Sequence, residues 1–287
     1  MAFFDPERRC LTLRLVYDGL GTAGKTTNVR QAHALFTLAR RGEVFAPAEE
    51  RGRTLFFDWL ELESGFVDEW PLRCQVLSVP GQFFYVQRRY ELLRSADAVV
   101  LVCDSSPAGV LRSRYAYCFL RRMMQEGGGA PVPIIVQANK QDMPGALPGP
   151  ALAAELGLEP GVRVVEASAA TGEGVRATLV FALQAARDEL RARLDRDGLA
   201  ALPAKRETAE EVYAHLLRHE DADEGVLLAD SVIATLLAER SPAGVEGPDP
   251  DPAAPGPRPP GAKGGGRPEA DPNAGGRRGR RGGRGAA

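Results

Sequence analysis

The stretch GLGTAGKTT, residues 19–27, comes directly after the apolar run Leu11–Tyr17. It contains the spacing G-x-x-x-x-G-K-T, in which glycines let the backbone turn tightly and bring its N–H groups against phosphate oxygens. A helix that starts at Lys25 would point the positive end of its dipole at the same anion. The Lys25 ammonium can reach β- and γ-phosphates, and the Thr26 hydroxyl is placed to bind Mg²⁺. We therefore interpret the stretch as a phosphate-binding loop rather than a plain glycine-rich turn. The residues expected to contact the phosphates are Gly19, Gly21, Thr22, Ala23, Gly24, Lys25, Thr26 and Thr27.

Short β-rich runs alternate with helical patterns along the first 200 residues. Runs such as AVVLVC and PIIV are apolar on both alternating faces, as strands buried between two layers of helices must be. The expected strands are Leu11–Tyr17, Thr54–Leu60, Arg73–Val79, Ala98–Cys103, Ile134–Gln137 and Val162–Glu166. The expected helices are roughly Lys25–Arg40, Phe83–Arg94, Gly109–Gln125, Ala151–Leu156 and Gly174–Asp197. This order predicts a three-layer α/β domain with a mostly parallel six-stranded sheet and helices on both faces.

The sequence changes character after the last of these helices. A short helix is expected from Thr208, because Thr208 and Glu211 have the spacing of a capping box, and a second over Val226–Glu239. These two helices either dock on the sheet domain or form a partner-binding hairpin. Glycine and proline fill 23 of the 47 positions in residues 241–287, so we expect a disordered tail there. Of the formal net charge of −2, the tail carries +3 and residues 1–240 carry −5.

Two further strand ends suit a guanine base. The tetrapeptide NKQD places Asn139, Lys140 and Asp142 after a buried strand. The Asp142 carboxylate can accept from both the N1–H and the exocyclic amine of guanine, a donor pair that adenine lacks. The Lys140 stem can cover the base plane, and Asn139 can tie this loop to the phosphate loop. In EASAATGEGV, the backbone N–H groups around Ser168 and Ala169 could face guanine O6.

In this order the motifs resemble a small Ras-like GTPase, and within that superfamily the bacterial gliding-motility and polarity GTPases of the MglA type. The resemblance spans residues 10–195 and is carried by GLGTAGKTTN, RGRTLFFDWL, SVPGQFFYVQRRYELLRSADAVVLVCDSS and NKQD. It implies a P-loop NTPase fold of the Ras-like type, binding of GTP and GDP with Mg²⁺, and slow GTP hydrolysis. It also implies nucleotide-dependent partner binding, a roadblock-type homodimer as activating protein, and regulation of cell polarity or motility. The expected layout is a GTPase domain over 10–198, a helical extension over 205–240 and the tail over 241–287.

The resemblance also assigns roles to residues around the two switch segments. Thr54 matches the switch I threonine that senses the γ-phosphate through Mg²⁺, and Gly81 can give its N–H to that phosphate. Gln82 matches the glutamine that orients the attacking water. Arg53 stands where MglA-type proteins keep an arginine that enters the site in cis, and a solvated loop arginine is the alternative. The implied catalytic residues are thus Gln82, Arg53 and Lys25, and the implied metal ligands are Thr26 and Thr54.

One departure from the wider superfamily concerns the metal. Most Ras-like proteins have Asp-x-x-Gly in the second switch, whereas this chain has Ser78-Val-Pro-Gly81. Ser78 keeps a hydroxyl but lacks the charge, which predicts weaker Mg²⁺ affinity. Asp58, from the expected strand before it, could compensate.

Other features exclude some classes of protein. The four cysteines are scattered without a Cys-x-x-Cys pair, which argues against a zinc site or a disulfide framework. His215 and His219 are four residues apart on an expected helix, but no third metal ligand is evident. No stretch reaches the length of a signal peptide or a membrane span, so we expect a soluble, cytoplasmic protein.

Two alternative functions stay open. The first is a nucleotide-binding scaffold with negligible turnover, which Ser78 favours and which Gln82 and Arg53 disfavour. The second is an RNA- or membrane-associated module that acts through the basic stretch GGRRGRRGGRG, residues 275–285. Five arginines without interleaved aromatic residues predict only weak attraction to nucleic acid or anionic lipid.

Overall fold

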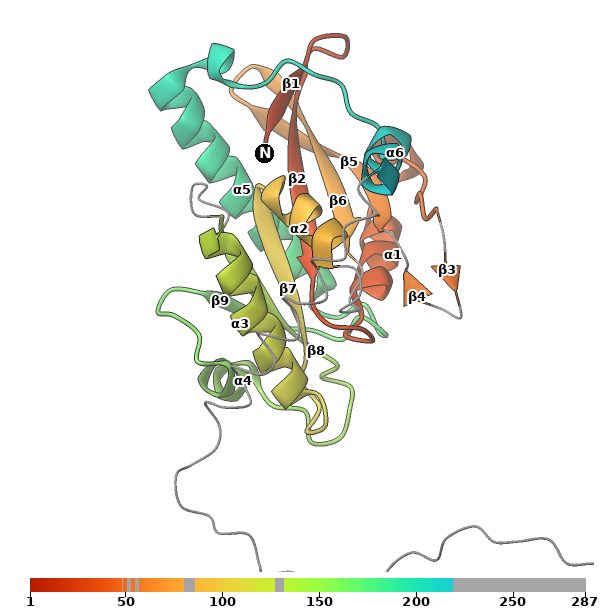
Figure 1. Cartoon of the computed structure of the whole chain (residues 1–287), viewed down its shortest axis with the longest axis vertical. Coiled ribbons are helices and arrows are strands. Elements are labelled where there is room, and N and C mark those ends of the chain that lie inside the picture. Colours follow the sequence, from red (N-terminus) through yellow and green to blue (C-terminus); the bar gives the residue numbers. More distant parts are fainter. Residues whose placement is uncertain (48, 51–52, 55–56, 80–85, 127–131, 219–287) are drawn as a thin grey trace, which may run out of the picture. The chain divides into compact units, whose positions relative to one another are not determined.

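A computed structural model describes residues 1–47, 49–50, 53–54, 57–79, 86–126 and 132–218 (Figure 1). The strands are β1 (Phe3–Asp5), β2 (Cys10–Asp18), β3 (Glu49–Glu50), β4 (Arg53–Thr54), β5 (Asp58–Val67), β6 (Trp70–Ser78), β7 (Ala98–Asp104), β8 (Ile134–Asn139) and β9 (Arg163–Glu166). The helices are α1 (Lys25–Leu35), α2 (Val86–Arg94), α3 (Val110–Glu126), α4 (Gly149–Leu156), α5 (Val175–Asp197) and α6 (Ala209–Arg218). Short 3₁₀ turns cover Leu38–Arg40 and Leu199–Ala201.

One mixed sheet organises the described part of the chain. Its strand order is β5-β6-β2-β7-β8-β9, with β1 added beside β2, which makes seven strands. The pairs β2–β6, β2–β7, β7–β8 and β8–β9 are parallel, whereas β5–β6 and β1–β2 are antiparallel. The mostly parallel sheet is therefore confirmed. The predicted number of six strands is wrong for the described residues, because β1 has only three residues and shows no usable alternation.

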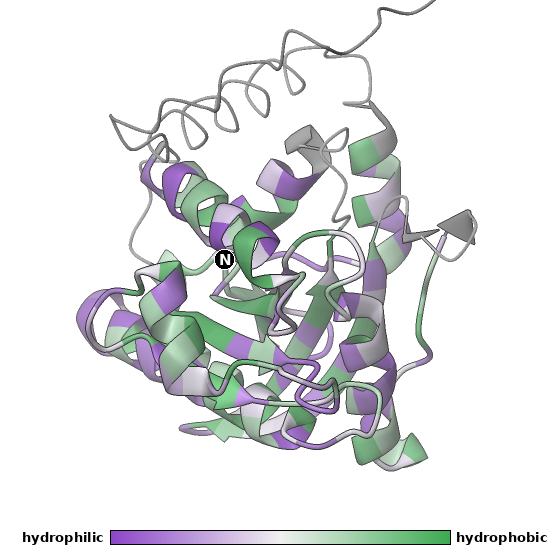
Figure 2. Cartoon of the chain, turned by 90° about the horizontal axis from the view of Figure 1, so that it is seen from below, coloured by the Kyte–Doolittle hydropathy of each residue, from purple (hydrophilic) through white to green (hydrophobic). Residues whose placement is uncertain are grey.

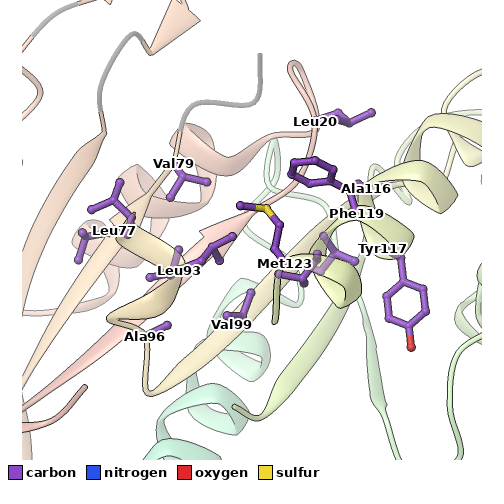
Figure 3. Packing of buried hydrophobic residues seen from close by; sticks show 14 of the residues in the cluster. Leu20, Leu77, Val79, Leu93, Ala96, Val99, Ala116, Tyr117, Phe119 and Met123 are labelled. Carbon is purple, nitrogen blue, oxygen red and sulfur yellow. The ribbon is translucent and has the colours of Figure 1, made fainter. Parts of the chain in front are cut away.

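Helices cover both faces of this sheet, as predicted for a three-layer α/β domain. Along β7, Val99, Leu101 and Cys103 belong to one buried cluster, and Ala98, Val100 and Val102 belong to the other. The first cluster packs under α2, α3 and α4 (Figure 3), and the second under α1 and α5. In Figure 2 the strands at the centre of the sheet are mainly hydrophobic in colour, while the helices alternate between hydrophobic and hydrophilic residues.

Several element boundaries differ from the expected ones. The predicted strand Thr54–Leu60 overlaps β5 only at residues 58–60, because Thr54 belongs to β4, which pairs with β3, and β5 runs from Asp58 to Val67. Helix α1 ends at Leu35 rather than Arg40, since Phe36 already has extended backbone angles. Helix α4 starts two residues earlier than expected, with Pro150 in its first turn, where the missing N–H costs nothing. The expected helix Val226–Glu239 lies outside the described residues.

The helical extension docks on the sheet domain as far as it is described. Thr208 and Glu211 form the predicted capping box, with Thr208 N–H donating to Glu211 Oε2 at 2.9 Å. Ala209, Val212 and Leu216 of α6 are buried in the cluster under α2 and α3.

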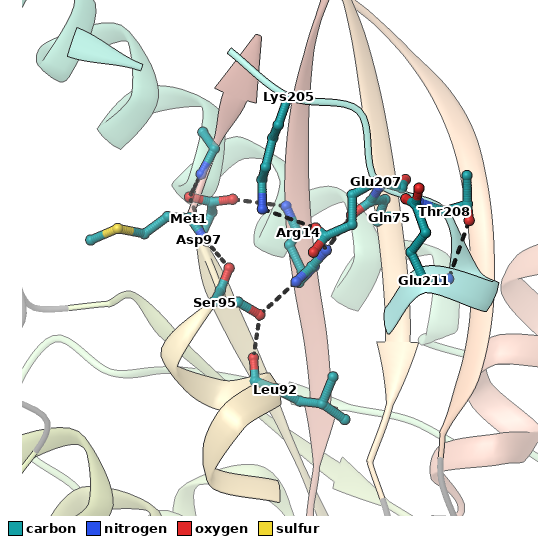
Figure 4. Close-up of polar contacts among 11 residues, drawn as sticks. Met1, Arg14, Gln75, Leu92, Ser95, Asp97, Lys205, Glu207, Thr208 and Glu211 are labelled. Carbon is teal, nitrogen blue, oxygen red and sulfur yellow. Dashed lines mark hydrogen bonds and ion pairs between the residues drawn. The ribbon is translucent and has the colours of Figure 1, made fainter. Parts of the chain in front are cut away.

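A buried arginine anchors the segment that leads into α6 (Figure 4). Arg14 of β2 donates to Gln75 Oε1 at 2.7 Å, to Ser95 Oγ at 2.7 Å and to Glu207 Oε2 at 2.5 Å. Burial would raise the pKa of Glu207, but the charges of Arg14 and Lys205 outweigh it and lower that pKa below its usual value. The segment before α6 is therefore held by a charged contact at the edge of the core.

Candidate functional site

The phosphate loop follows β2 and requires glycine at two positions. Gly19 has a φ of 139°, and a Cβ there would lie 2.4 Å from the carbonyl oxygen of Val102. Gly24 has a φ of 104°, and its Cβ would lie 2.4 Å from Nδ2 of Asn139. Any larger residue would therefore push the loop away from β7 and β8. The loop predicted from the glycine spacing is formed, with Gly24 at the start of α1.

Lys25 is buried beneath this loop. Its Nζ donates to the carbonyl oxygens of Gly19 at 2.8 Å and Leu20 at 2.9 Å. Burial lowers the pKa of Lys25 to about 8, while the negative charges of Asp18 and Asp58 act in the opposite direction. Phosphate groups at the start of α1 would add charge that favours the ammonium form. The first turn of α1 contains no acidic residue, so its N-terminus is suited to an anion.

The remaining loop residues lie at the rim or just behind it. Gly21, Thr22 and Thr27 are exposed, and Ala23 is buried. Thr22 has a φ of 67°, which is uncommon for a residue with a side chain and reflects the tight turn.

The side chain of Asn139 joins three segments at the carboxyl edge of the sheet. Its Nδ2 donates to the carbonyl oxygen of Ala23 at 2.7 Å, and its Oδ1 accepts from Ala169 N–H at 2.9 Å. Asn139 thus makes the predicted connection to the phosphate loop. The N–H of Ser168 donates to Glu173, so neither of the amides expected at guanine O6 is free in this structure. Their contact with guanine stays a prediction.

Lys140 and Asp142 follow Asn139 at the surface. Lys140 has a left-handed φ of 68° and its Nζ lies 2.7 Å from Oδ2 of Asp104. Burial would raise the pKa of Asp104, but hydrogen bonds from Lys140 and Ser106 lower it below its usual value. Asp142 is exposed, so its carboxylate is accessible to the edge of a guanine base. Asp104 was not predicted to belong to the site. Its position at the carboxyl end of the apolar strand β7 is a signal that could have identified it.

The metal side of the site contains oxygen groups from three elements. Thr26 Oγ1 donates to Asp58 Oδ2 at 2.7 Å, which places Asp58 where its compensating role was predicted. Ser78 is the cross-strand partner of Asp58, and its buried Oγ has no hydrogen-bond partner among the described residues. Hydroxyl and carboxylate oxygens fit Mg²⁺, which usually keeps several waters and takes further oxygens from phosphates. Within the described part, no group of three or more His, Cys, Asp or Glu side chains could hold a metal ion by itself.

The switch residues are described only in part. Arg53 and Thr54 form β4, but their side chains are not described. Gly81 and Gln82 lie outside the described residues. His215 is exposed on α6, and His219 is outside the described residues, so the structure adds nothing in favour of a metal there. No helix in the described ranges is long and apolar enough to cross a membrane.

Comparison with known proteins identifies the family to which a chain with this phosphate loop belongs. Residues 74–185 match the model of the ADP-ribosylation factor (Arf) family. Over 149 residues the chain is 33% identical to the mutual gliding-motility protein MglA of Myxococcus xanthus, a match that covers 51% of this chain and 76% of that protein. The chain belongs to the MglA-type small Ras-like GTPases. The three-layer fold is therefore the Ras-like P-loop fold, and GTPases of this family bind GTP and GDP, generally with Mg²⁺.

Proposed function

We propose that this GTPase is a nucleotide-dependent switch that hydrolyses GTP slowly alone and faster with a partner. The observation that carries the proposal is the position of Asn139, which joins the phosphate loop to the two loops expected around guanine. A base in those loops and phosphates on Lys25 would then belong to one nucleotide. Lys25 would hold the phosphates. Thr26, whose hydroxyl donates to Asp58, would hold Mg²⁺, which when bound would neutralise charge at the phosphates.

The proposed catalytic roles rest on the family resemblance. Gln82 would orient the attacking water, and Arg53 would offset charge that develops in the transition state, an effect worth roughly 10³–10⁵-fold in related enzymes. Thr54 and Gly81 would sense the γ-phosphate. Asp142 would select guanine.

Single-turnover hydrolysis of GTP with Mg²⁺ tests this function. We expect measurable turnover in the full chain, and a decrease of at least about tenfold in Arg53→Ala and Gln82→Ala with GDP affinity retained. Asp142→Ala should instead lose affinity for GDP. Tight binding without turnover would contradict the switch and favour the scaffold alternative, for which the uncharged Ser78 is the supporting observation.

We further propose that the partner is a roadblock-type homodimer and that the switch acts in cell polarity or motility. The name of the relative, a mutual gliding-motility protein, supports the role in motility. The roadblock-type partner rests on the family resemblance alone. Turnover that stays unchanged when such a homodimer is added would contradict the partner assignment.

A further inference from the structure

A buried ion pair connects the phosphate loop to helix α2. Asp18 is the last residue of β2 and directly precedes Gly19, and its side chain is fully buried. Arg89 of α2 faces it with two nitrogens, Nε at 2.6 Å from Oδ1 and Nη2 at 2.6 Å from Oδ2. The guanidinium also lies over the ring of Phe119 of α3, 4.6 Å from its centroid. Arg89 is thus held from two sides.

Arg89 faces an apolar layer on one side. Its guanidinium lies over the ring of Phe119, which belongs to a buried hydrophobic cluster with Leu20, Val79 and Leu93 (Figure 3). A buried ion pair is a poor source of stability, because two apolar side chains of similar size often serve as well or better. The pair is nevertheless well defined in position, because Arg89 Nη2 donates a hydrogen bond to Asp18 Oδ2, Arg89 Nε lies 2.6 Å from Oδ1, and the guanidinium packs on the ring of Phe119. The pair therefore defines where α2 lies relative to β2.

The pair also influences the charge balance next to the phosphate loop. Gly19 directly follows Asp18, and its carbonyl oxygen accepts a hydrogen bond from the buried Lys25 ammonium at 2.8 Å, so the pair adjoins the residue expected to hold the phosphates. Without Arg89, a buried carboxylate would stand unneutralised directly before the phosphate loop. It would then oppose the binding of an anionic nucleotide.

We propose that the Asp18–Arg89 pair makes the position of helix α2 depend on whether a nucleotide occupies the phosphate loop. Arg89 is a positioning residue that acts through Asp18. Helix α2 begins at Val86, four residues after Gln82, so it directly continues the stretch of sequence expected to form the second switch. This inference rests on the proposed function, because it assigns the pair a part in the nucleotide response.

The test compares wild type, Arg89→Gln, Asp18→Asn and the double variant. Arg89→Lys is added because it keeps the charge but loses the planar guanidinium that contacts both Asp18 and Phe119. Arg94→Gln is the matched control, since Arg94 is exposed on the same helix and stacks on Tyr90. Three quantities are measured in full-length protein: the affinity for GDP, hydrogen exchange of the backbone amides of residues 86–94 with and without nucleotide, and single-turnover hydrolysis of GTP.

We expect Arg89→Gln to weaken GDP binding at least tenfold, and the double variant to return to within threefold of wild type, since its buried charge is gone. Nucleotide should slow amide exchange of residues 86–94 in wild type and in Arg94→Gln, but not in the double variant. Hydrolysis by the double variant should stay at least tenfold slower despite restored affinity. If the pair had only a structural role, the double variant would recover amide protection and hydrolysis together with its affinity for GDP.

Nucleotide-dependent protection of α2 that persists in the double variant would overturn the proposal. If Arg89→Gln does not fold, Arg89→Lys decides, with near-normal affinity and reduced protection expected, and full protection contradicting the coupling. Absence of hydrolysis in wild type would refute the proposed function, whereas the exchange data would still decide the coupling.

Discussion

Removal of the Asp58 carboxylate should weaken the binding of Mg²⁺. Asp58 is 1% exposed, and its Oδ2 accepts the hydroxyl proton of Thr26 at 2.7 Å. This hydrogen bond leaves a lone pair of the Thr26 oxygen available for Mg²⁺. The Asp58 carboxylate would also place negative charge near that ion, which the uncharged Ser78 does not provide. Asp58→Asn keeps size and shape and removes only the charge.

The expected magnitude follows from the role of a residue that supports a metal ligand. Loss of such a partner typically lowers metal affinity about 10–100-fold, or about 1.4–2.7 kcal/mol. Release of a fluorescent GDP analogue, followed at increasing Mg²⁺ concentration, measures this directly, because bound Mg²⁺ slows release. The Mg²⁺ concentration of half-maximal effect should rise by that factor in Asp58→Asn. Glu61→Gln is the control, because Glu61 lies on the same strand and pairs with Arg73 at the surface.

A second variant tests where the charge is needed. Asp58 and Ser78 are directly opposite in the β5–β6 ladder, where facing Cβ atoms are about 4.5–5.5 Å apart. Adding Ser78→Asp to Asp58→Asn moves one carboxylate across this short distance and should restore much of the Mg²⁺ dependence. An unchanged half-maximal concentration in Asp58→Asn would refute the reasoning. So would a double variant as weak as the single one.

Two further predictions concern the loop and the extension. Gly24→Ala should lower GDP affinity about tenfold or more in an equilibrium titration, because alanine strains a positive φ and its Cβ meets Asn139; Gly157→Ala, which meets no neighbour, should leave that affinity unchanged. Because the pKa of Glu207 is lowered in the folded protein, its contact with Arg14 stabilises the fold above about pH 4.5 and is lost as pH falls through the folded-state pKa. Thermal unfolding followed from pH 7 into the acid range should therefore show Glu207→Gln less stable than wild type at pH 7, with a difference that shrinks as the pH falls below 4.5. A difference that stays constant over this range would contradict the prediction.

Local signals allowed much of this molecule to be predicted. The glycine spacing, the doubly apolar strands and the capping box at Thr208 each concern residues close in sequence, and the structure has all three. Asn139 could be placed as well, since the carboxyl ends of parallel strands meet at one edge of a sheet.

Ion pairs between residues far apart in the sequence could not be predicted. Asp18 and Arg89 are 71 positions apart, and their meeting depends on how α2 packs on β2. Arg14 and Glu207 are 193 positions apart. From the sequence alone, Arg14 is a single charged residue in an apolar strand, and nothing near it in the chain indicates its partner. Strand β1 was missed for another reason, because a three-residue strand shows too little alternation to be recognised.

Strand β5 connects the metal side of the site to the extension. Asp58 reaches Thr26 of α1, whereas its neighbours Phe57 and Trp59 are buried in the opposite core, which also holds Val212 and Leu216 of α6. Since successive residues of a strand point to opposite faces, a shift of β5 along its axis would move both sets together. The side chains of α6 therefore help to fix the strand position that gives Thr26 its carboxylate partner. Helix α6, which lies outside residues 74–185 that match the Arf family model, thus shares a buried cluster with the two residues that flank Asp58.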